Sequence, residues 1–247
     1  MPSVEETTIY FDRHAERLVR PHLVDKWAAL APLFADLKPQ SRLLECGAGT
    51  GLYTIRLLER GFTVLSVDLS NRSLTQLKTL AHERHLTSQL TTWQGEFLEF
   101  VSTTQEMFDA IVFIKVLHHF SSIQHIGSAL EAAYTRLTPA GRLIGFEPNG
   151  DSILWKPWLQ MQGKAVWENE QHVMLMRRTL LERIFVNLPQ ADYKFAHHYV
   201  IPGCILRFLP ALARADRYLC QLPFCSRLAL NLSFLVQRRI CASYDRT

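Results

Sequence analysis

A glycine-rich turn constrains the fold of this chain more than any other part of the sequence. Residues 43–51 read LLECGAGTG, an apolar run that leads into three alternating glycines, and a helical pattern follows. Glycines at such a turn let the backbone approach a ligand with no Cβ in the way. The helix after the turn offers free N–H groups and its positive dipole end to an anionic group. The sequence therefore predicts a strand, a turn and a helix that together bind a cofactor.

A second carboxylate supports this interpretation. Asp68 ends the next predicted strand, 21 residues after Gly47, where an acid can accept both hydroxyls of a ribose. That geometry serves any nucleoside cofactor. Two details disfavour a nicotinamide dinucleotide: Tyr53 stands where the dinucleotide fingerprint has Gly or Ala, and Glu45 would repel a pyrophosphate but can neutralise an ammonium group.

Short apolar runs alternate with amphipathic helical patterns through the first 150 residues. Strands are predicted at 42–46, 62–67, 90–94, 110–114 and 142–147, with helices at 51–59, 71–83 and 122–137. Such alternation predicts an α/β fold with a doubly wound, mostly parallel sheet and helices on both faces. Further helices are expected at 4–19, 22–37 and 177–187, further strands at 192–200 and 230–236, and irregular chain at 148–176.

Composition excludes several other classes of protein. The net charge of +4 over 247 residues is too small, and too evenly spread before residue 203, for a nucleic-acid partner. The five cysteines are odd in number and lack CxxC spacing, so we expect no metal site and no disulfide framework, and we expect a cytoplasmic protein with free thiols. The charged N-terminus does not resemble a signal peptide, and no run of 18 apolar residues predicts a membrane span.

The motifs at 43–51 (LLECGAGTG), 64–70 (VLSVDLS), 93–100 (WQGEFLEF), 108–120 (FDAIVFIKVLHHF) and 137–150 (LTPAGRLIGFEPNG) occur in the order found in one family. Over residues 40–148 the chain resembles the class I S-adenosylmethionine (SAM)-dependent methyltransferases, with a core like the type 11 small-molecule enzymes. The resemblance implies a Rossmann-like seven-stranded sheet whose last strand is antiparallel, with SAM as cofactor and S-adenosylhomocysteine as product.

The resemblance also implies how one methyltransferase domain, 1–247, is organised. Residues 1–40 would form a helical cap, 41–147 the SAM-binding core, 148–176 an acceptor lid, and 177–247 the C-terminal half of the sheet with a helical insertion at 204–222. The family motifs place the cofactor contacts at Glu45, Gly47, Ala48, Gly49, Gly51, Asp68, Leu69, Glu96, Phe97 and Lys115. Glu96 departs from the usual Asp, and Lys115 from a small polar residue.

Methyl transfer is an in-line displacement with a good leaving group, so the protein mainly aligns the acceptor and removes a proton where necessary. The catalytic candidates are His118 and His119, which follow the fourth strand, and Glu147, which ends the fifth. Each has a simpler alternative: the histidines can be packing and hydrogen-bonding elements, and Glu147 can be a carboxylate that orders a loop.

The acceptor is expected to be a small molecule, with an aromatic or lipid-like one among the alternatives. Aromatic residues suit such an acceptor and can also hold a cation, although plain cover of the core explains them equally well. The candidate contacts are Tyr10, Phe11, His119, Asn149, Trp155, Trp158 and Trp167.

The stretch 204–222 mixes apolar residues at helical spacing with arginines. It suits a helix packed on the sheet, a homodimer contact, or a peripheral contact with an acidic membrane or lipid-like substrate. Two other functions stay open: a non-catalytic SAM-binding module, and an NAD-dependent oxidoreductase. The Asn/Asp-Pro-Pro-aromatic tetrapeptide of enzymes that methylate planar amines of nucleic acids is missing from this sequence.

Overall fold

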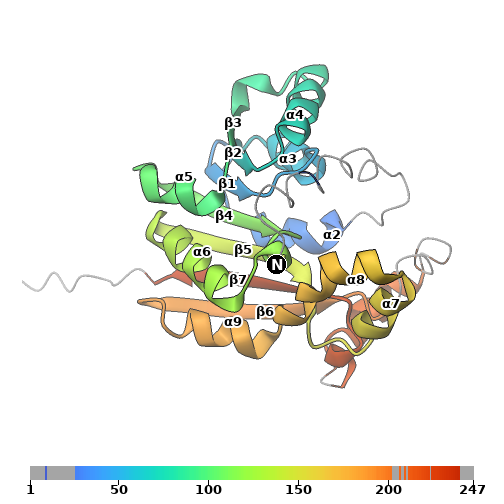
Figure 1. Cartoon of the computed structure of the whole chain (residues 1–247). Helices are drawn as coiled ribbons and strands as arrows, with labels where there is room; N and C mark the ends of the chain where they lie inside the picture. Colours follow the sequence, from blue (N-terminus) through green and yellow to red (C-terminus); the bar gives the residue numbers. More distant parts are fainter. Residues whose placement is uncertain are drawn as a thin grey trace, which may run out of the picture.

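The computed structural model describes residues 9, 26–201, 206, 209, 211–222 and 224–239. Its centre is a seven-stranded sheet in the order β3-β2-β1-β4-β5-β7-β6 (Figure 1). Only β7 runs antiparallel to its neighbours β5 and β6, which confirms the predicted topology. The strands are β1 (Arg42–Cys46), β2 (Thr63–Asp68), β3 (Leu90–Gln94), β4 (Phe108–Ile114), β5 (Leu137–Pro148), β6 (Ala191–His198) and β7 (Asn231–Arg238).

Helices cover both faces of this sheet and bury a separate apolar core on each (Figure 1). On one face lie α2 (Trp27–Leu30), the 3₁₀ turn η1 (Ala31–Phe34), α3 (Leu52–Leu58) and α4 (Asn71–Glu83). On the other lie α5 (Phe97–Thr103), α6 (Ile123–Thr135) and α9 (Arg178–Phe185). The 3₁₀ turn η2 (Thr87–Gln89) leads into β3. This is the doubly wound arrangement that the alternating pattern predicts.

Strand β4 shows why the sequence folds in this way. From Ala110 onward its side chains alternate, since Ile111 and Phe113 enter one core, while Val112 and Ile114 enter the other. Because strand side chains alternate between faces, a strand covered on both faces has to be apolar throughout. The strand therefore sits at the centre of the sheet, and the residues just after it, beginning with Lys115, open onto its carboxyl end.

Several predicted bounds need correction. The segment expected to be irregular, 148–176, contains α7 (Trp155–Met161), α8 (Lys164–Glu170) and the 3₁₀ turn η4 (Gln171–Leu175). These helices are only one to two turns long, and the composition of the segment is typical of a loop, so the sequence did not predict them. Lys115 follows β4 and is not part of it, and α5 was not predicted. Tyr10, Phe11 and nearly all of the helix expected at 4–19 lie outside the described residues.

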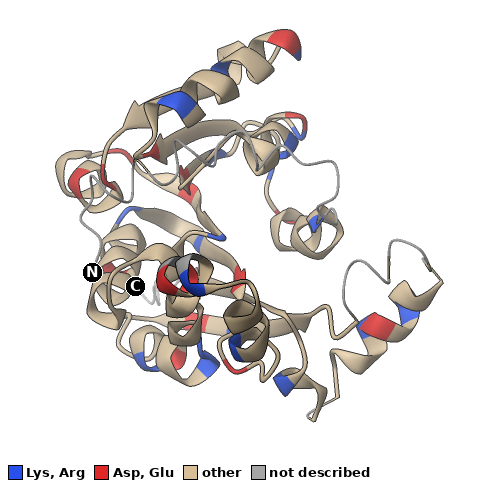
Figure 2. Cartoon of the chain, turned by 45° about the vertical axis from the view of Figure 1, so that its right-hand side comes forward, with Lys and Arg blue, Asp and Glu red and all other residues tan. Residues whose placement is uncertain are grey.

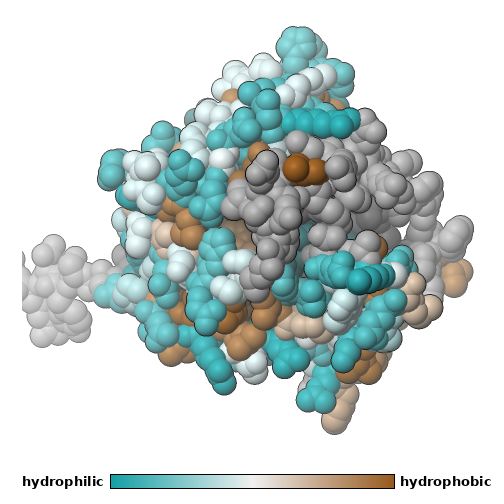
Figure 3. Space-filling model, viewed as in Figure 1, coloured by the Kyte–Doolittle hydropathy of each residue, from teal (hydrophilic) through white to brown (hydrophobic). Residues whose placement is uncertain are grey.

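The helical insertion is described only in part. Within it, α11 (Leu212–Leu219) begins eight residues later than the predicted stretch, and the 3₁₀ turn η5 (Cys225–Arg227) precedes β7. Charges of both signs are spread over the outer helices (Figure 2), and hydrophilic side chains dominate the coloured part of the face in Figure 3. Among the described residues, no helix is long and apolar enough to cross a membrane.

Candidate active site

The glycine turn lies between β1 and α3, at the carboxyl end of the sheet. Gly47, Gly49 and Gly51 all adopt positive φ, at 69°, 52° and 90°. A side chain on Gly47 would clash with Val116, and one on Gly51 would clash with Leu77. A Cβ on Gly49, by contrast, would meet no atom of the described residues within 4 Å. Two of the glycines are therefore required by packing, and Gly49 presents bare backbone to open space.

Asp68, at the end of β2, ties this turn to the neighbouring strand. Its Oδ2 accepts the Gly49 N–H at 2.7 Å, and its Oδ1 accepts the Ser70 N–H at 2.9 Å. The sequence predicted a ribose-binding acid here, and the structure shows an additional task for the same carboxylate, that of fixing the turn.

Glu45 is buried beneath the turn. Its Oε2 accepts hydrogen bonds from the Thr54 hydroxyl at 2.6 Å and from the Ser66 hydroxyl at 3.2 Å. Burial raises the pKa of Glu45 to about 7, against the opposing effect of these two hydrogen bonds, and the negative charge of Asp68 adds to the rise. A cationic group placed near the turn would favour the ionised form of this carboxyl.

The predicted adenine contacts lie at the start of α5. Glu96 caps this helix, and its Oε1 lies 3.2 Å from Nε2 of His125 on α6. The Phe97 ring is buried and packs edge-on against Phe113, 5.2 Å between centroids. Leu69, on the loop after β2, is half-buried. The roles of these three residues toward a nucleoside stay predictions.

The second half of the site forms around the 3₁₀ turn η3 (Leu117–His119), which follows β4. The side chain of Glu147, at the end of β5, is completely buried beneath it. Its Oε1 accepts the N–H groups of Val116 and Leu117 at 2.8 and 2.9 Å, and its Oε2 lies 2.7 Å from His118 Nδ1. These contacts favour the loop-ordering alternative for Glu147 over direct contact with an acceptor.

His118 is held between two carboxylates. Its Nε2 lies 3.6 Å from Oε2 of Glu170, at the end of α8. Burial alone would lower the pKa of His118, but Glu147 and Glu170 outweigh burial and raise it. The pKa of Glu170 falls to about 2, since His118 and the neighbouring cationic groups outweigh its burial. His118 is therefore a poor general base, and it links the lid segment to the strand ends.

His119 differs from His118 in the direction of its pKa shift. Its ring centroid lies 3.9 Å from that of His118. Burial, followed by the charge of His118, lowers the pKa of His119 to about 3. The imidazole is thus neutral near pH 7 and can accept a hydrogen bond, although such a low pKa makes it a weak base. Of the three catalytic candidates, His119 best suits direct contact with an acceptor.

Ligand atoms of His118, His119 and Glu170 lie within 4.8 Å of one another, a spacing that could hold a metal ion. The surroundings argue against this. His118 has a raised pKa, which favours the protonated ring over the neutral ring that a metal requires. The positive charge of Lys115 also acts on His119 and would repel a cation there. That this site holds no metal ion stays a prediction.

The remaining acceptor candidates differ in position. Asn149 is fully buried, and its amide donates to the Ser226 and Ala229 carbonyls, so its described contacts are structural. The Trp155 indole donates to the Leu230 carbonyl at 2.9 Å, and Trp158 packs edge-on against it. Trp167, on α8, is half-buried.

Two lysines, Lys26 and Lys115, also belong to the second half of the site. The sequence did not suggest Lys26. Lys115 has a φ of 57°, and its Nζ lies 5.9 Å from the centre of the Trp155 ring. Lys26, just before α2, donates to Asn231 Oδ1 at 3.1 Å. The amino group of Lys115 is close enough to that of Lys26 to lower the pKa of Lys26. Neither Lys26 nor Glu170 lies in a sequence motif, and only the folded chain brings them to the carboxyl end of the sheet.

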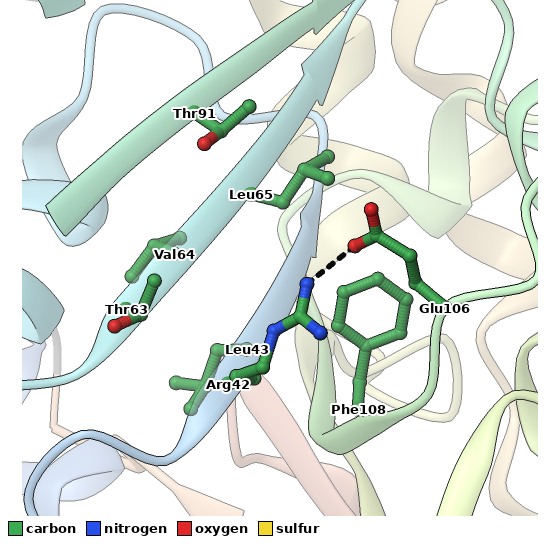
Figure 4. A pocket seen from close by; sticks show the side chains of 8 residues that line it. All are labelled: Arg42, Leu43, Thr63, Val64, Leu65, Thr91, Glu106 and Phe108. Carbon is green, nitrogen blue, oxygen red and sulfur yellow. Dashed lines mark hydrogen bonds and ion pairs between the residues drawn. The ribbon is translucent and has the colours of Figure 1, made fainter.

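A small pocket elsewhere on the sheet is not part of this site. It is lined by residues at the amino ends of β1, β2 and β4, including Arg42, Thr63 and Phe108 (Figure 4). Its two charged groups, Arg42 and Glu106, pair with each other across the opening. Parallel α/β sheets bind ligands at the carboxyl ends of their strands, the opposite edge.

Comparisons with known proteins agree with this geometry. A family model described as a methyltransferase domain matches residues 11–188. A phosphoethanolamine N-methyltransferase of Haemonchus contortus, solved with S-adenosyl-L-methionine, superposes with a TM-score of 0.67 at 15% identity, over 97% of this chain and 60% of that one. The chain therefore belongs to the methyltransferase domain family, within the class I SAM-dependent methyltransferases.

Two curated relatives are glycine/sarcosine N-methyltransferases. The protein from Aphanothece halophytica is 32% identical over 114 residues, which are 46% of this chain and 42% of the relative. The protein from Halorhodospira halochloris is 31% identical over 157 residues, 58% of each chain. The chain thus spans about half the length of these relatives, and the likeness establishes the family without establishing an acceptor.

Proposed function

We propose that this protein is a SAM-dependent methyltransferase that acts on a small-molecule acceptor by direct displacement. The observation that carries the proposal is the bare Gly49 backbone, fixed by Asp68 at the carboxyl end of the sheet. This is a cradle that a Cβ at Gly49 would enter, and it adjoins the helix N-terminus of α3. The residues present thus fit a nucleoside amino acid.

We assign the residues of the cofactor half as follows. The turn at Gly47, Ala48, Gly49 and Gly51 would hold the amino-acid part, with the buried Glu45 favouring its ammonium group. Asp68 would accept the ribose hydroxyls, and Leu69, Glu96 and Phe97 would surround the adenine. When bound, SAM supplies a methyl group on a positively charged sulfonium.

In the acceptor half, the chain's own residues would align the acceptor and exclude water. Glu147 fixes η3 through two backbone N–H groups and His118, and this positions His119 beside the acceptor. His119 would orient an acceptor hydroxyl or amine by accepting its hydrogen bond. Trp155, Trp158 and Trp167 come from the lid segment and would cover the acceptor. The free cysteines among the described residues support a reducing, cytoplasmic setting.

The test is calorimetric titration of the purified protein with SAM and, separately, with NADH. We expect SAM to bind and NADH to give no heat. Asp68→Ala should weaken SAM binding by roughly a hundredfold, because two charge-assisted hydrogen bonds that fix the turn are lost with the ribose contact. Glu131→Ala, which removes an exposed acid from α6, is the matched control and should bind as wild type.

NADH binding in place of SAM would overturn the proposal in favour of an oxidoreductase. If SAM binds but no acceptor among amines, hydroxyl compounds and carbon acids takes up label from methyl-labelled SAM, the non-catalytic SAM-binding module becomes the better interpretation. Incorporation of label into one acceptor class establishes turnover.

A further inference from the structure

Five segments that are distant in sequence meet beside η3 and bring two lysines together. Lys26 precedes α2 and Lys115 follows β4, while Trp155, Tyr199 and Asn231 come from α7, the loop after β6 and the start of β7. Lys26 Nζ lies 3.1 Å from Asn231 Oδ1 and 5.9 Å from the Tyr199 ring centre. Lys115 Nζ lies 5.9 Å from the Trp155 ring centre. Both amino groups are thus partly buried among neutral and aromatic neighbours.

Neither lysine forms an ion pair with a carboxylate among the residues that the structure describes. The two acids nearest in the fold are already engaged. Glu147 accepts two backbone N–H groups and the His118 ring, and Glu170 pairs with the same ring from its other side. Two neighbouring lysines whose described contacts are an amide oxygen and aromatic rings form an arrangement that a negatively charged ligand would complete.

The backbone shows a second, independent peculiarity at the same place. Lys115 and Tyr199 both have left-handed conformations, with φ values of 57° and 63°. Such a conformation brings the Cβ atom too close to the following carbonyl oxygen, which costs on the order of 1–2 kcal/mol in residues other than glycine. Backbone hydrogen bonds maintain it, from Lys115 N–H to the Phe146 carbonyl and from Leu230 N–H to the Tyr199 carbonyl. Glycine would adopt this conformation after β4 at less cost, so Lys115 lowers the stability of the turn.

We propose that Lys26 and Lys115 bind an anionic oxygen group, a carboxylate or a phosphate, on the methyl acceptor. This inference rests on the proposed function and gives the acceptor its chemical class. Lysine ammonium groups act as point charges and serve both anions. Lys115 adjoins Val116, whose side chain packs on Gly47 of the cofactor turn, so an acceptor held by its anion would lie next to the bound cofactor.

Electrostatics indicates how binding would be detected. Burial, and then the charge of Lys115, lowers the pKa of Lys26 to about 6. Burial also lowers the pKa of Lys115, although Glu147 and Glu170 act in the opposite direction. An anion between the lysines favours their protonated forms, so its binding takes up protons. The heat of binding should therefore depend on the ionisation enthalpy of the buffer.

The experiment uses the full chain saturated with S-adenosylhomocysteine. Benzoate, its neutral analogue benzamide, and inorganic phosphate are titrated separately, and calorimetry in two buffers measures affinity and proton uptake. We expect at least one of the two anions to bind with proton uptake, and benzamide to bind much more weakly. Preference for benzoate would indicate a carboxylate acceptor, and preference for phosphate a phosphorylated one.

Variants connect that binding to the lysine pair. Lys26→Met and Lys115→Met should each weaken anion binding about tenfold or more, and Lys26→Arg, which keeps the charge, should lose much less. The matched control is Lys164→Met, which removes a lysine from α8 whose side chain is 88% exposed. Circular dichroism and a cooperative urea transition like those of the wild type would show that each variant folds, and each variant is saturated with S-adenosylhomocysteine before the anion is added.

Three results would overturn the proposal: neither anion binds to the loaded protein, benzamide binds as tightly as benzoate, or the methionine variants bind anions as wild type does. Failure of the proposed function gives a different pattern, in which S-adenosylhomocysteine itself does not bind. The same anion titrations on the cofactor-free protein and the same variants would then still decide the role of the two lysines.

Discussion

The two halves of this site are built in different ways. In the cofactor half, the main groups come from one stretch, residues 45–70. They are the backbone of three glycines at positive φ and one carboxylate, Asp68, which accepts the N–H of Gly49. In the acceptor half, side chains from five distant segments surround η3. The first half is therefore a local motif, and the second is a product of the tertiary structure.

The halves also differ in the charges that burial acts on. Glu45 beneath the glycine turn is a buried acid whose pKa rises to about 7. His119 and Lys26 in the acceptor half are basic groups whose pKa values fall to about 3 and about 6. Burial penalises the charged form in every case, so it acts in opposite directions on acids and bases. The following predictions test this contrast.

The largest effect on stability is expected in the acceptor half, from Glu147→Ala. The change leaves two buried N–H groups and the His118 ring without their acceptor, and loss of such a partner costs about 3–5 kcal/mol. Urea denaturation at constant pH measures it. Glu131→Ala, at an exposed position of α6, should change the free energy of unfolding by less than about 0.5 kcal/mol. Equal effects of the two variants would mean that Glu147 does not order η3.

In the cofactor half, two glycines separate packing from ligand approach. Gly47→Ala combines a left-handed alanine with a clash against Val116 and should cost about 2–4 kcal/mol of stability. Gly49→Ala meets no atom and should cost only about 1–2 kcal/mol, for its conformation. The added methyl group of Gly49→Ala nevertheless enters the open cradle. This variant should therefore lose more affinity for SAM than its small loss of stability would suggest.

Urea denaturation and SAM titration of both glycine variants provide the comparison. If Gly49→Ala binds SAM as wild type does, the cradle is not where the cofactor approaches. If Gly47→Ala is as stable as Gly49→Ala, the contact with Val116 does not constrain the turn.

The sequence predicted the structure of the glycine turn and its flanking strands well because the signals for them are local. Apolar strands, alternating glycines and the strand-end Asp68 occur in one short stretch, and helix 71–83 was predicted with the bounds that the structure has. The seven strands and the antiparallel last strand followed from the resemblance. Even here, sequence could not show that Asp68 also anchors the Gly49 N–H, since that depends on the folded turn.

The acceptor half was predicted much less well. Lys26 belongs to an ordinary helical pattern and Glu170 to a segment expected to be irregular, and neither lies in a motif. Lys26 reaches Asn231, and Glu170 reaches His118 in η3, only through tertiary packing, which local patterns do not specify. His118, His119 and Glu147 were recognised as candidates, but only their contacts distinguish an ordering carboxylate from a group that faces the acceptor.

A pH prediction tests the sign of burial in the cofactor half. Because the folded-state pKa of Glu45 is raised from 4.5 to about 7, its contribution to stability is complete below pH 4.5 and is lost as pH rises through 7, by about 3 kcal/mol in total. Glu45→Gln removes this titration. The stability of Glu45→Gln relative to wild type should therefore increase between those pH values.

His119 acts in the opposite direction in the wild type, because a lowered pKa gives stability that is lost as pH falls below 6.5. The difference between Glu45→Gln and wild type cancels that contribution, so the comparison isolates Glu45. Urea denaturation at a series of pH values measures it. A difference that stays flat, or falls, with rising pH would show that Glu45 is ionised in the folded protein.

The smallest effect is expected where the lid segment meets the strand ends. Glu170→Gln removes one of the two carboxylates beside His118, at 3.6 Å and with Glu170 partly exposed, so the loss of stability should be about 1 kcal/mol or less. The pKa of His118 should fall, since Glu147 alone then opposes its burial. Glu168→Gln on the same helix, whose carboxylate pairs with Lys164, is the matched control and should leave the His118 titration unchanged.

Imidazole signals followed by NMR through a pH series would measure that shift. Because a raised histidine pKa gives stability that is lost as pH rises through it, the cost of Glu170→Gln should shrink above the pKa of His118. An unchanged His118 titration would mean that α8 does not rest on η3 in solution. The acceptor half would then be assembled only when a ligand draws the lid segment down, whereas the cofactor half is formed in advance by its own stretch of chain.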